Sequence, residues 1–227
     1  MKIKSMFTLV AAMITTSLFS QITTGSISYD AYLSSDNPQF KQMLGQMEES
    51  STVDMYFTDG KLRTDMVIPN FSTTNTIAVK EEENGLMLMD NSFLGKIAIV
   101  ITSEDKEKQQ EQSDKVDVKL IDGETKKILG YDCKKAIISV ENQGEFELWY
   151  TEEIVPEIRE GQFLYEEIKG LPLEMTTKMM GMDIKLEAYS FKDKLSKKQK
   201  ENLFSLEIPK GYTVKTFEDL RMMGGGR

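Results

Sequence analysis

The stretch VDMYFTDGKLRTDM, residues 53–66, decides the fold class. Apolar side chains occupy every second position in residues 53–57, and the alternation resumes in residues 62–66. The two arms are joined through Asp59-Gly60, a pair that tolerates positive φ and is a strong signal for a tight hairpin turn. The stretch therefore predicts a β-hairpin, and it predicts an antiparallel sheet around that hairpin.

Short apolar runs separated by turn signals predict further strands on both sides of the hairpin. They are residues 25–33, 76–80, 85–90, 96–102, 116–121, 133–141, 145–151, 173–180 and 183–191. Pro38 and the helical spacing that follows it predict a short helix over residues 38–47, and two more are expected at residues 196–204 and after Phe217. The predicted fold is mainly β (α+β): a curved antiparallel sheet or unclosed half-barrel with a few short helices, one of them covering the concave side.

The first twenty residues, MKIKSMFTLVAAMITTSLFS, have the layout of an export signal. Lys2 and Lys4 supply positive charge, residues 6–19 are uncharged, and Ser20 is a small residue ahead of cleavage before Gln21. The apolar stretch is too short to span a bilayer as a stable helix. We expect a Sec-type signal peptide and a periplasmic or secreted protein; a buried N-terminal helix or an uncleaved anchor is the alternative. Without a cysteine near residue 20, lipid attachment there is excluded.

Beyond the signal, we expect one β-rich domain over residues 21–220. Residues 103–115, SEDKEKQQEQSDK, contain no apolar side chain and predict a solvated polar loop within this domain. A division into two small domains at this loop is the alternative. Residues 221–227, which include the glycine run 224–226, are predicted to be a flexible tail.

Composition narrows the possible chemistry. The absence of histidine excludes imidazole zinc sites, Ser–His–Asp triads and Cys–His pairs, although carboxylate chemistry remains open. Consecutive glutamates, at residues 81–83, 152–153 and 166–167, point to opposite faces of a strand and predict solvated surface rather than a catalytic pair. We therefore predict that the chain is not an enzyme and uses no cofactor.

Charge and sulfur content limit the possible ligands. Removing residues 1–20 leaves 26 basic and 37 acidic side chains, a net charge of −11, which disfavours nucleic acid and permits at most peripheral membrane contact. Paired methionines suggest Cu(I), but they are widely separated and no histidine supports them, and the sequence has no D-x-D-x-D-G calcium loop. No metal site is predicted. Cys133, the single cysteine, is expected to be a buried thiol, with an intermolecular disulfide left open.

Three motifs in residues 128–175 resemble a family of uncharacterised secreted proteins of Gram-negative bacteria, a domain of unknown function neighbouring the GLPGLI family. They are G-x-x-C-x-K-A from Gly130 to Ala136, WYT-x-x-I from Trp149 to Ile154, and Gly170-Leu171-Pro172. Leu173-Glu174-Met175 depart from the second half of GLPGLI. The first half of the chain is similar in layout to lipoprotein-carrier (LolA-like) proteins, and this similarity implies a helix-plugged half-barrel with a lipid on its concave side.

Two strands carry apolar side chains on both faces, LMLM at residues 86–89 and IAIVI at residues 97–101. Such strands need cover on each side, from local loops, a partner protein or an apolar ligand. Trp149 either lines a ligand cleft or is buried under residues 155–172. The candidate residues for an apolar ligand are Met87, Met89, Ala98, Val100, Trp149 and Met179.

From these features we expect a non-enzymatic periplasmic binding or carrier-type module for an apolar ligand, such as a lipid, or for a lipidated partner. The alternative is an envelope protein that forms protein–protein or structural contacts and has no small-molecule ligand.

Overall fold

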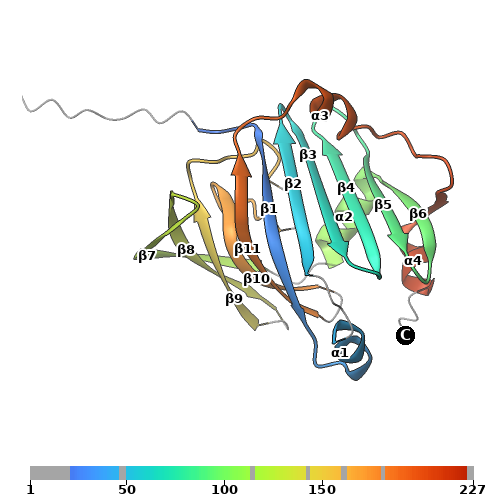
Figure 1. The fold of residues 1–227 in the computed structure, drawn as a ribbon, viewed down its shortest axis with the longest axis horizontal. Coiled ribbons are helices and arrows are strands. Elements are labelled where there is room, and N and C mark those ends of the chain that lie inside the picture. The colour runs from blue at the N-terminus through green and yellow to red at the C-terminus, as the bar shows by residue number, and fades with distance from the viewer. Residues whose placement is uncertain are drawn as a thin grey trace, which may run out of the picture.

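The computed structural model describes residues 21–45, 50–112, 116–141, 144–159, 163–179 and 182–223. The predicted signal peptide, residues 1–20, lies outside this range. The described strands form one twelve-stranded sheet in the order β12-β6-β5-β4-β3-β2-β1-β11-β10-β9-β8-β7 (Figure 1). The sheet has two free edges, β12 and β7, so the prediction of a curved, unclosed, mainly β fold is confirmed.

The strands are antiparallel to their neighbours except for β12, which pairs in parallel with β6. Their bounds are β1 Gly25–Ser34, β2 Ser51–Thr58, β3 Lys61–Ile68, β4 Ser72–Val79, β5 Gly85–Asn91, β6 Gly95–Ile101, β7 Val116–Ile128, β8 Tyr131–Val140, β9 Gly144–Thr151, β10 Leu171–Met179, β11 Met182–Lys192 and β12 Thr213–Lys215. The helices are α1 Pro38–Leu44, α2 Ser103–Gln112, α3 Lys197–Asn202 and α4 Phe217–Met223.

The predicted hairpin is β2–β3. Thr58 pairs with Lys61, so Asp59-Gly60 is a two-residue turn, and both residues have positive φ, 34° and 68°. This combination matches the right-handed twist of the two strands, and it explains why the local sequence alone predicted the turn.

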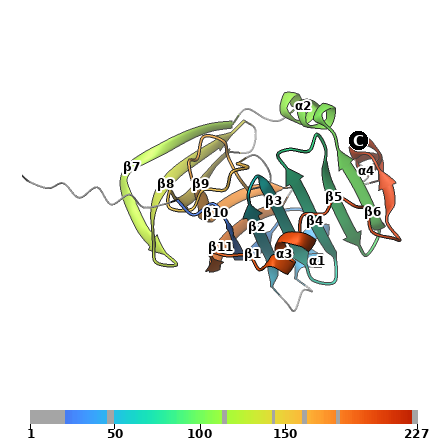
Figure 2. The same cartoon turned by 90° about the horizontal axis from the view of Figure 1, so that it is seen from above.

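The main core lies on one face of the curled sheet. Ile27, Met55 and Leu148 come from strands, and they pack in the same buried cluster as Phe163 and Ile168 from the β9–β10 connection. Figure 2 shows the described parts of this connection, residues 152–159 and 163–170, on the inner side of the curl. The prediction that a helix covers the concave side is therefore corrected: in the part of the chain that the structure describes, a non-helical segment fills it.

The strands with two apolar faces are covered on both sides by the C-terminal part of the chain. Leu86, Leu88 and Ala98 pack against residues from the α3–β12 connection: Leu206, Ile208 and Tyr212. On the other face, Met89, Ile97 and Ile99 pack against α4 through Phe217 and Leu220. Of the three possible covers for these apolar faces, local loops, a partner protein or an apolar ligand, the structure shows local segments of the same chain.

Two segments differ from their predictions. Residues 103–112 of the expected polar loop form α2, while residues 113–115 lie outside the described part of the chain. The α2 N-terminus is capped because the Thr102 hydroxyl accepts from the Asp105 N–H at 3.1 Å and the Asp105 carboxylate accepts from the Thr102 N–H at 2.9 Å. The expected tail begins within α4, which continues to Met223, and residues 224–227 are outside the described range.

Candidate functional site

The β9–β10 connection is attached to the start of the folded chain. Ile22 and Ile154 form a parallel bridge, in which the Ile22 N–H donates to the Glu153 carbonyl at 2.8 Å and the Val155 N–H donates to the Ile22 carbonyl at 2.9 Å. Ile154 is fully buried in the main core, so this junction has a fixed position. Gln21 and Thr23, on either side of Ile22, are therefore held beside residues 153–155.

The other end of the connection is equally constrained. Ile168 is buried in the core, and a Cβ added at Gly170 would lie 2.1 Å from the Thr151 carbonyl oxygen. Only glycine permits this close approach of the chain to β9. Lys169 lies between these two residues, so its backbone is fixed although its side chain is exposed.

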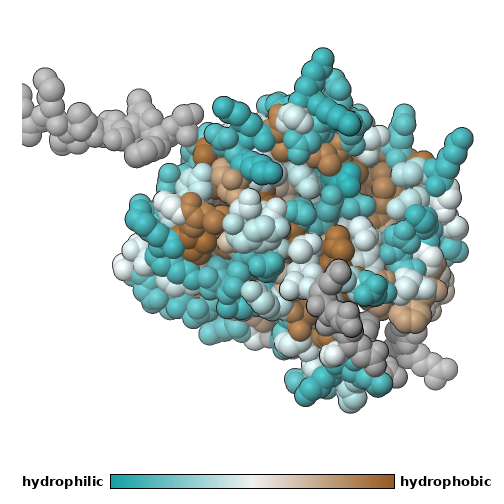
Figure 3. All heavy atoms as spheres, viewed as in Figure 1, coloured by the Kyte–Doolittle hydropathy of each residue, from teal (hydrophilic) through white to brown (hydrophobic). Residues whose placement is uncertain are grey.

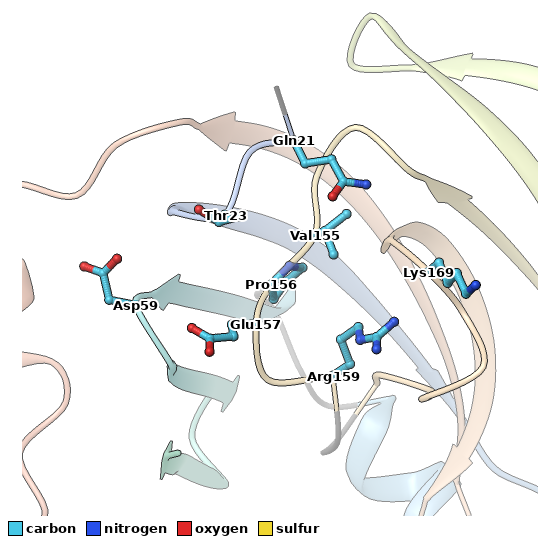
Figure 4. Close-up of a pocket in the computed structure, with 8 residues that line it drawn as sticks. All are labelled: Gln21, Thr23, Asp59, Val155, Pro156, Glu157, Arg159 and Lys169. Atoms are coloured by element: carbon cyan, nitrogen blue, oxygen red, sulfur yellow. The ribbon is translucent and has the colours of Figure 1, made fainter. Parts of the chain in front are cut away.

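A cavity of about 460 Å³ opens where this connection, the chain start and the β2–β3 turn meet. Figure 4 shows its lining, with Val155 and Pro156 lying between polar and charged side chains. The lining residues are Gln21, Thr23, Asp59, Val155, Pro156, Glu157, Arg159 and Lys169.

The charged side chains of the cavity are separated by sign. In Figure 4, Asp59 and Glu157 lie on one side of Pro156, while Arg159 and Lys169 lie on the other side. Glu157 forms an ion pair with Lys80 at 2.6 Å, and Asp59 lies 3.6 Å from Lys200. The cavity thus offers hydroxyl, amide, carboxylate and cationic groups around a small apolar surface, a combination that can hold a polar ligand in one orientation.

The structure does not bring the sequence-predicted ligand residues together. Met87 and Met89 lie on the β5–β6 face that α4 covers, and Ala98 lies on the opposite face. Val100 is 37% exposed, and Met179 ends β10 opposite Met182. None of these five residues lines the 460 Å³ cavity.

Trp149 is partly buried on β9 and packs against the main core. The Nζ atoms of Lys126 and Lys135 lie 4.5 Å and 5.6 Å from its ring centroid. Lys126 is paired with Glu174 at 2.6 Å, and Lys135 with Glu147 at 2.9 Å. The indole is thus held in a charged cluster on the sheet. The face of the molecule drawn in Figure 3 is mainly hydrophilic, and its apolar residues form separate patches.

Cys133 is buried, as the sequence predicted, and burial raises the pKa of its thiol to about 11. Within the described ranges, no three Cys, Asp or Glu side chains gather to hold a metal ion. No helix in these same ranges is long and apolar enough to cross a membrane.

Sequence reasoning missed the residues of the cavity. Arg159 and Lys169 lie in a connection with no strand or helix periodicity, and Gln21 is 131 residues from its hydrogen-bond acceptor, the Glu152 carbonyl, at 3.4 Å. The spacing of residues within one segment cannot predict a contact between segments so far apart in the sequence. The one available indication was a long connection without regular periodicity between two predicted strands, since such loops often carry function.

The chain belongs to the family described as N-glycanase peptide, N-terminal domain, whose model matches residues 41–203. The fold is also similar to solved structures of PNGF-II in two space groups. The P21 form has 19% identity over 88% of this chain and 33% of that chain, with a TM-score of 0.49. The C2 form has 17% identity over 88% and 32%, with a TM-score of 0.47. This chain therefore spans about a third of the PNGF-II chain.

A third similar structure is an uncharacterized conserved protein from Thermus thermophilus. It has 12% identity over 86% of this chain and 91% of that chain, with a TM-score of 0.46. The comparison with curated proteins gave no match.

Family membership corrects two predictions. The predicted binding or carrier-type function for an apolar ligand or lipidated partner is wrong for a family described as an N-glycanase domain, and the interaction-protein alternative is wrong with it. The prediction that the chain is not an enzyme is contradicted by the same match. It relied on the missing histidine, yet carboxylates can also act as general acids and bases. The match supports neither the GLPGLI nor the LolA-like resemblance.

Proposed function

We propose that this chain takes part in the processing of N-linked glycans and that its cavity binds the oligosaccharide. The observation that carries the proposal is the position of the cavity within a fold that belongs to an N-glycanase family. The residues of its wall come from both ends of the β9–β10 connection and from the chain start, so the fold as a whole forms it.

The chemistry of the lining suits a sugar. Sugar hydroxyls both donate and accept hydrogen bonds, and the cavity has donors on Gln21 and Arg159 and acceptors on Asp59 and Glu157. The side chains of Val155 and Pro156 offer an apolar surface to the C–H groups of a pyranose ring. The volume of about 460 Å³ lies within the common range for ligand sites, roughly 300–1,000 Å³.

The cavity is also preformed. Ile154 and Ile168 anchor the two ends of the connection in the core, and the Ile22 bridge joins the chain start to it. A preformed wall lowers the entropy lost on binding, which favours recognition of a flexible oligosaccharide.

Export remains part of the proposal. The charge and apolar pattern of residues 1–20 predicts a signal peptide, and Ile22 is already hydrogen-bonded to Glu153 in the fold. Cleavage ahead of Gln21 would make Ile22 the second residue of the mature chain, and Ile22 is hydrogen-bonded to the β9–β10 connection. Such a protein would meet glycoproteins outside the cytoplasm.

Calorimetric titration of residues 21–227 with a free N-linked oligosaccharide tests this proposal. The double variant Gln21→Leu/Thr23→Val removes two exposed polar groups from the wall, and we expect it to bind about tenfold more weakly, because each lost hydrogen bond contributes about 0.5–1.5 kcal/mol. Thr213→Val, on exposed β12, is the matched control and should bind as the wild type does.

A second arm incubates the same protein with an N-glycoprotein and follows the mass of the polypeptide. Release of the glycan would assign hydrolysis to this chain as well as binding. If the wild type neither binds the oligosaccharide nor releases it, the proposal is wrong.

A further inference from the structure

The carboxylates of the cavity are electrostatically compensated. Lys80 Nζ lies 2.6 Å from Glu157 Oε1, and Lys200 Nζ from α3 lies 3.6 Å from Asp59 Oδ2. The Thr58 hydroxyl also donates to Asp59 Oδ2 at 3.1 Å. Each acidic group on this side of the cavity therefore has a cation of its own.

The cations on the other side are not compensated. Among the described residues, neither Arg159 nor Lys169 has a carboxylate within 4.0 Å, the ion-pair limit that thirteen other pairs satisfy. Once the paired charges cancel, the described lining residues leave two positive charges on one wall, those of Arg159 and Lys169. This is unusual in a chain whose overall net charge is −9.

The position of these two cations favours a ligand over a solvated surface. Arg159 is half-buried, and both residues lie within a few positions of the buried anchors Ile154 and Ile168. Figure 4 shows both cations on the side of Pro156 away from Asp59 and Glu157, and the Gln21 amide above Val155. A guanidinium presents a planar fork of donors that matches a carboxylate, and an ammonium adds a point charge beside it.

We propose that this wall is a subsite for an anionic sugar, with Arg159 and Lys169 binding its carboxylate and Gln21 and Thr23 binding its hydroxyls. This inference rests on the proposed function, because it names the class of glycan that the cavity selects. An acidic terminal sugar on an N-linked oligosaccharide has this combination of a carboxylate and adjacent hydroxyls.

Three probes test the subsite by calorimetry at low and high salt: 3′-sialyllactose, lactose and acetate. We expect the wild type to bind sialyllactose at least tenfold more tightly than lactose, and acetate more weakly than both. Arg159→Gln and Lys169→Gln should each weaken sialyllactose binding about tenfold, a larger loss than either variant causes for lactose. The sialyllactose preference should decrease at high salt, because exposed charges are screened. Lys119→Gln, which removes one exposed positive charge from β7, is the control and should change nothing.

The possible failures are distinguishable. Equal binding of sialyllactose and lactose, unaffected by either variant, would overturn the subsite and leave glycan binding standing. Acetate binding as tight as sialyllactose would show a simple anion site and would also overturn it. If neither sugar binds while the free N-linked oligosaccharide does, the subsite alone is wrong; if that oligosaccharide also fails to bind and is not released, the proposed function is wrong as well.

Discussion

Replacing Met89 by Glu tests whether the second apolar face of β5–β6 is truly covered. Met89 is 8% exposed and packs with Ile97 and Ile99 beneath Phe217 and Leu220 of α4. A glutamate here must either stay buried without a cation or displace α4. In an open ligand-binding face, the same change would have little effect on stability.

The magnitude follows from the packing. Losing a buried methionine costs about 1.5–3 kcal/mol, and enclosing an unpaired carboxylate adds several more if nothing moves. Displacing α4 avoids the second cost but exposes Ile97 and Ile99, so we expect a net loss of about 3–5 kcal/mol in the free energy of unfolding. At about 2–4 °C per kcal/mol for a domain of this size, the melting temperature should fall by roughly 6–20 °C.

Thermal unfolding followed by circular dichroism measures this loss. Met222→Glu is the matched control, because Met222 lies on the same helix but is 66% exposed, and its effect should stay within about 0.5 kcal/mol. Equal melting temperatures for the Met89 variant and the wild type would refute the covering role of α4.

Three further outcomes follow from local structure. Burial raises the pKa of the Cys133 thiol to about 11, so the thiol should react slowly with a thiol reagent at neutral pH and quickly once urea unfolds the chain. Rapid labelling of the native protein would contradict this burial. Hydrogen bonds from the Thr216 N–H and hydroxyl lower the pKa of Asp219 at the start of α4. The melting temperature of the wild type should therefore exceed that of Asp219→Ala above the ordinary carboxyl pKa, and the difference should disappear as the pH falls through the lowered pKa of Asp219. A difference that does not depend on pH would argue against the cap. Gly60→Ala should cost about 1–2 kcal/mol in urea denaturation, because φ is 68° there, and an unchanged midpoint would mean that the turn relaxes.

The hairpin and most strands could be predicted because their signals are local. Alternation fixes which side chains share a face, and Asp59-Gly60 fixes the turn. Register is harder to predict. The ligand candidates group Met87 and Met89 with Ala98 and Val100, but β5 and β6 pair Met87 with Ile99 and Leu88 with Ala98, so the two sets lie on opposite faces. A shift of one residue reverses the face of every side chain, so the expected apolar surface does not form.

Helix α2 was missed because its side chains are almost entirely polar, which is typical of a loop. It is stabilised at its start by the reciprocal Thr102–Asp105 bonds, and an i,i+4 pair at 2.6 Å joins Lys108 to Glu104. The pattern Thr-x-x-Asp is a capping-box signal that the sequence did contain. The cavity had no comparable signal, since its walls are far apart along the chain and are brought together by tertiary contacts such as the Ile22–Ile154 bridge.

The most direct measurement of the central claim is a backbone amide NMR titration of residues 21–227 with a sialylated N-linked oligosaccharide. If the cavity binds the glycan, the largest shift changes should fall at Ile22 and Thr23, at the Asp59-Gly60 turn, at Val155 and from Glu157 to Arg159, and they should saturate together. Changes centred on Trp149 or on β5–β6, or no saturable changes at all, would contradict the account.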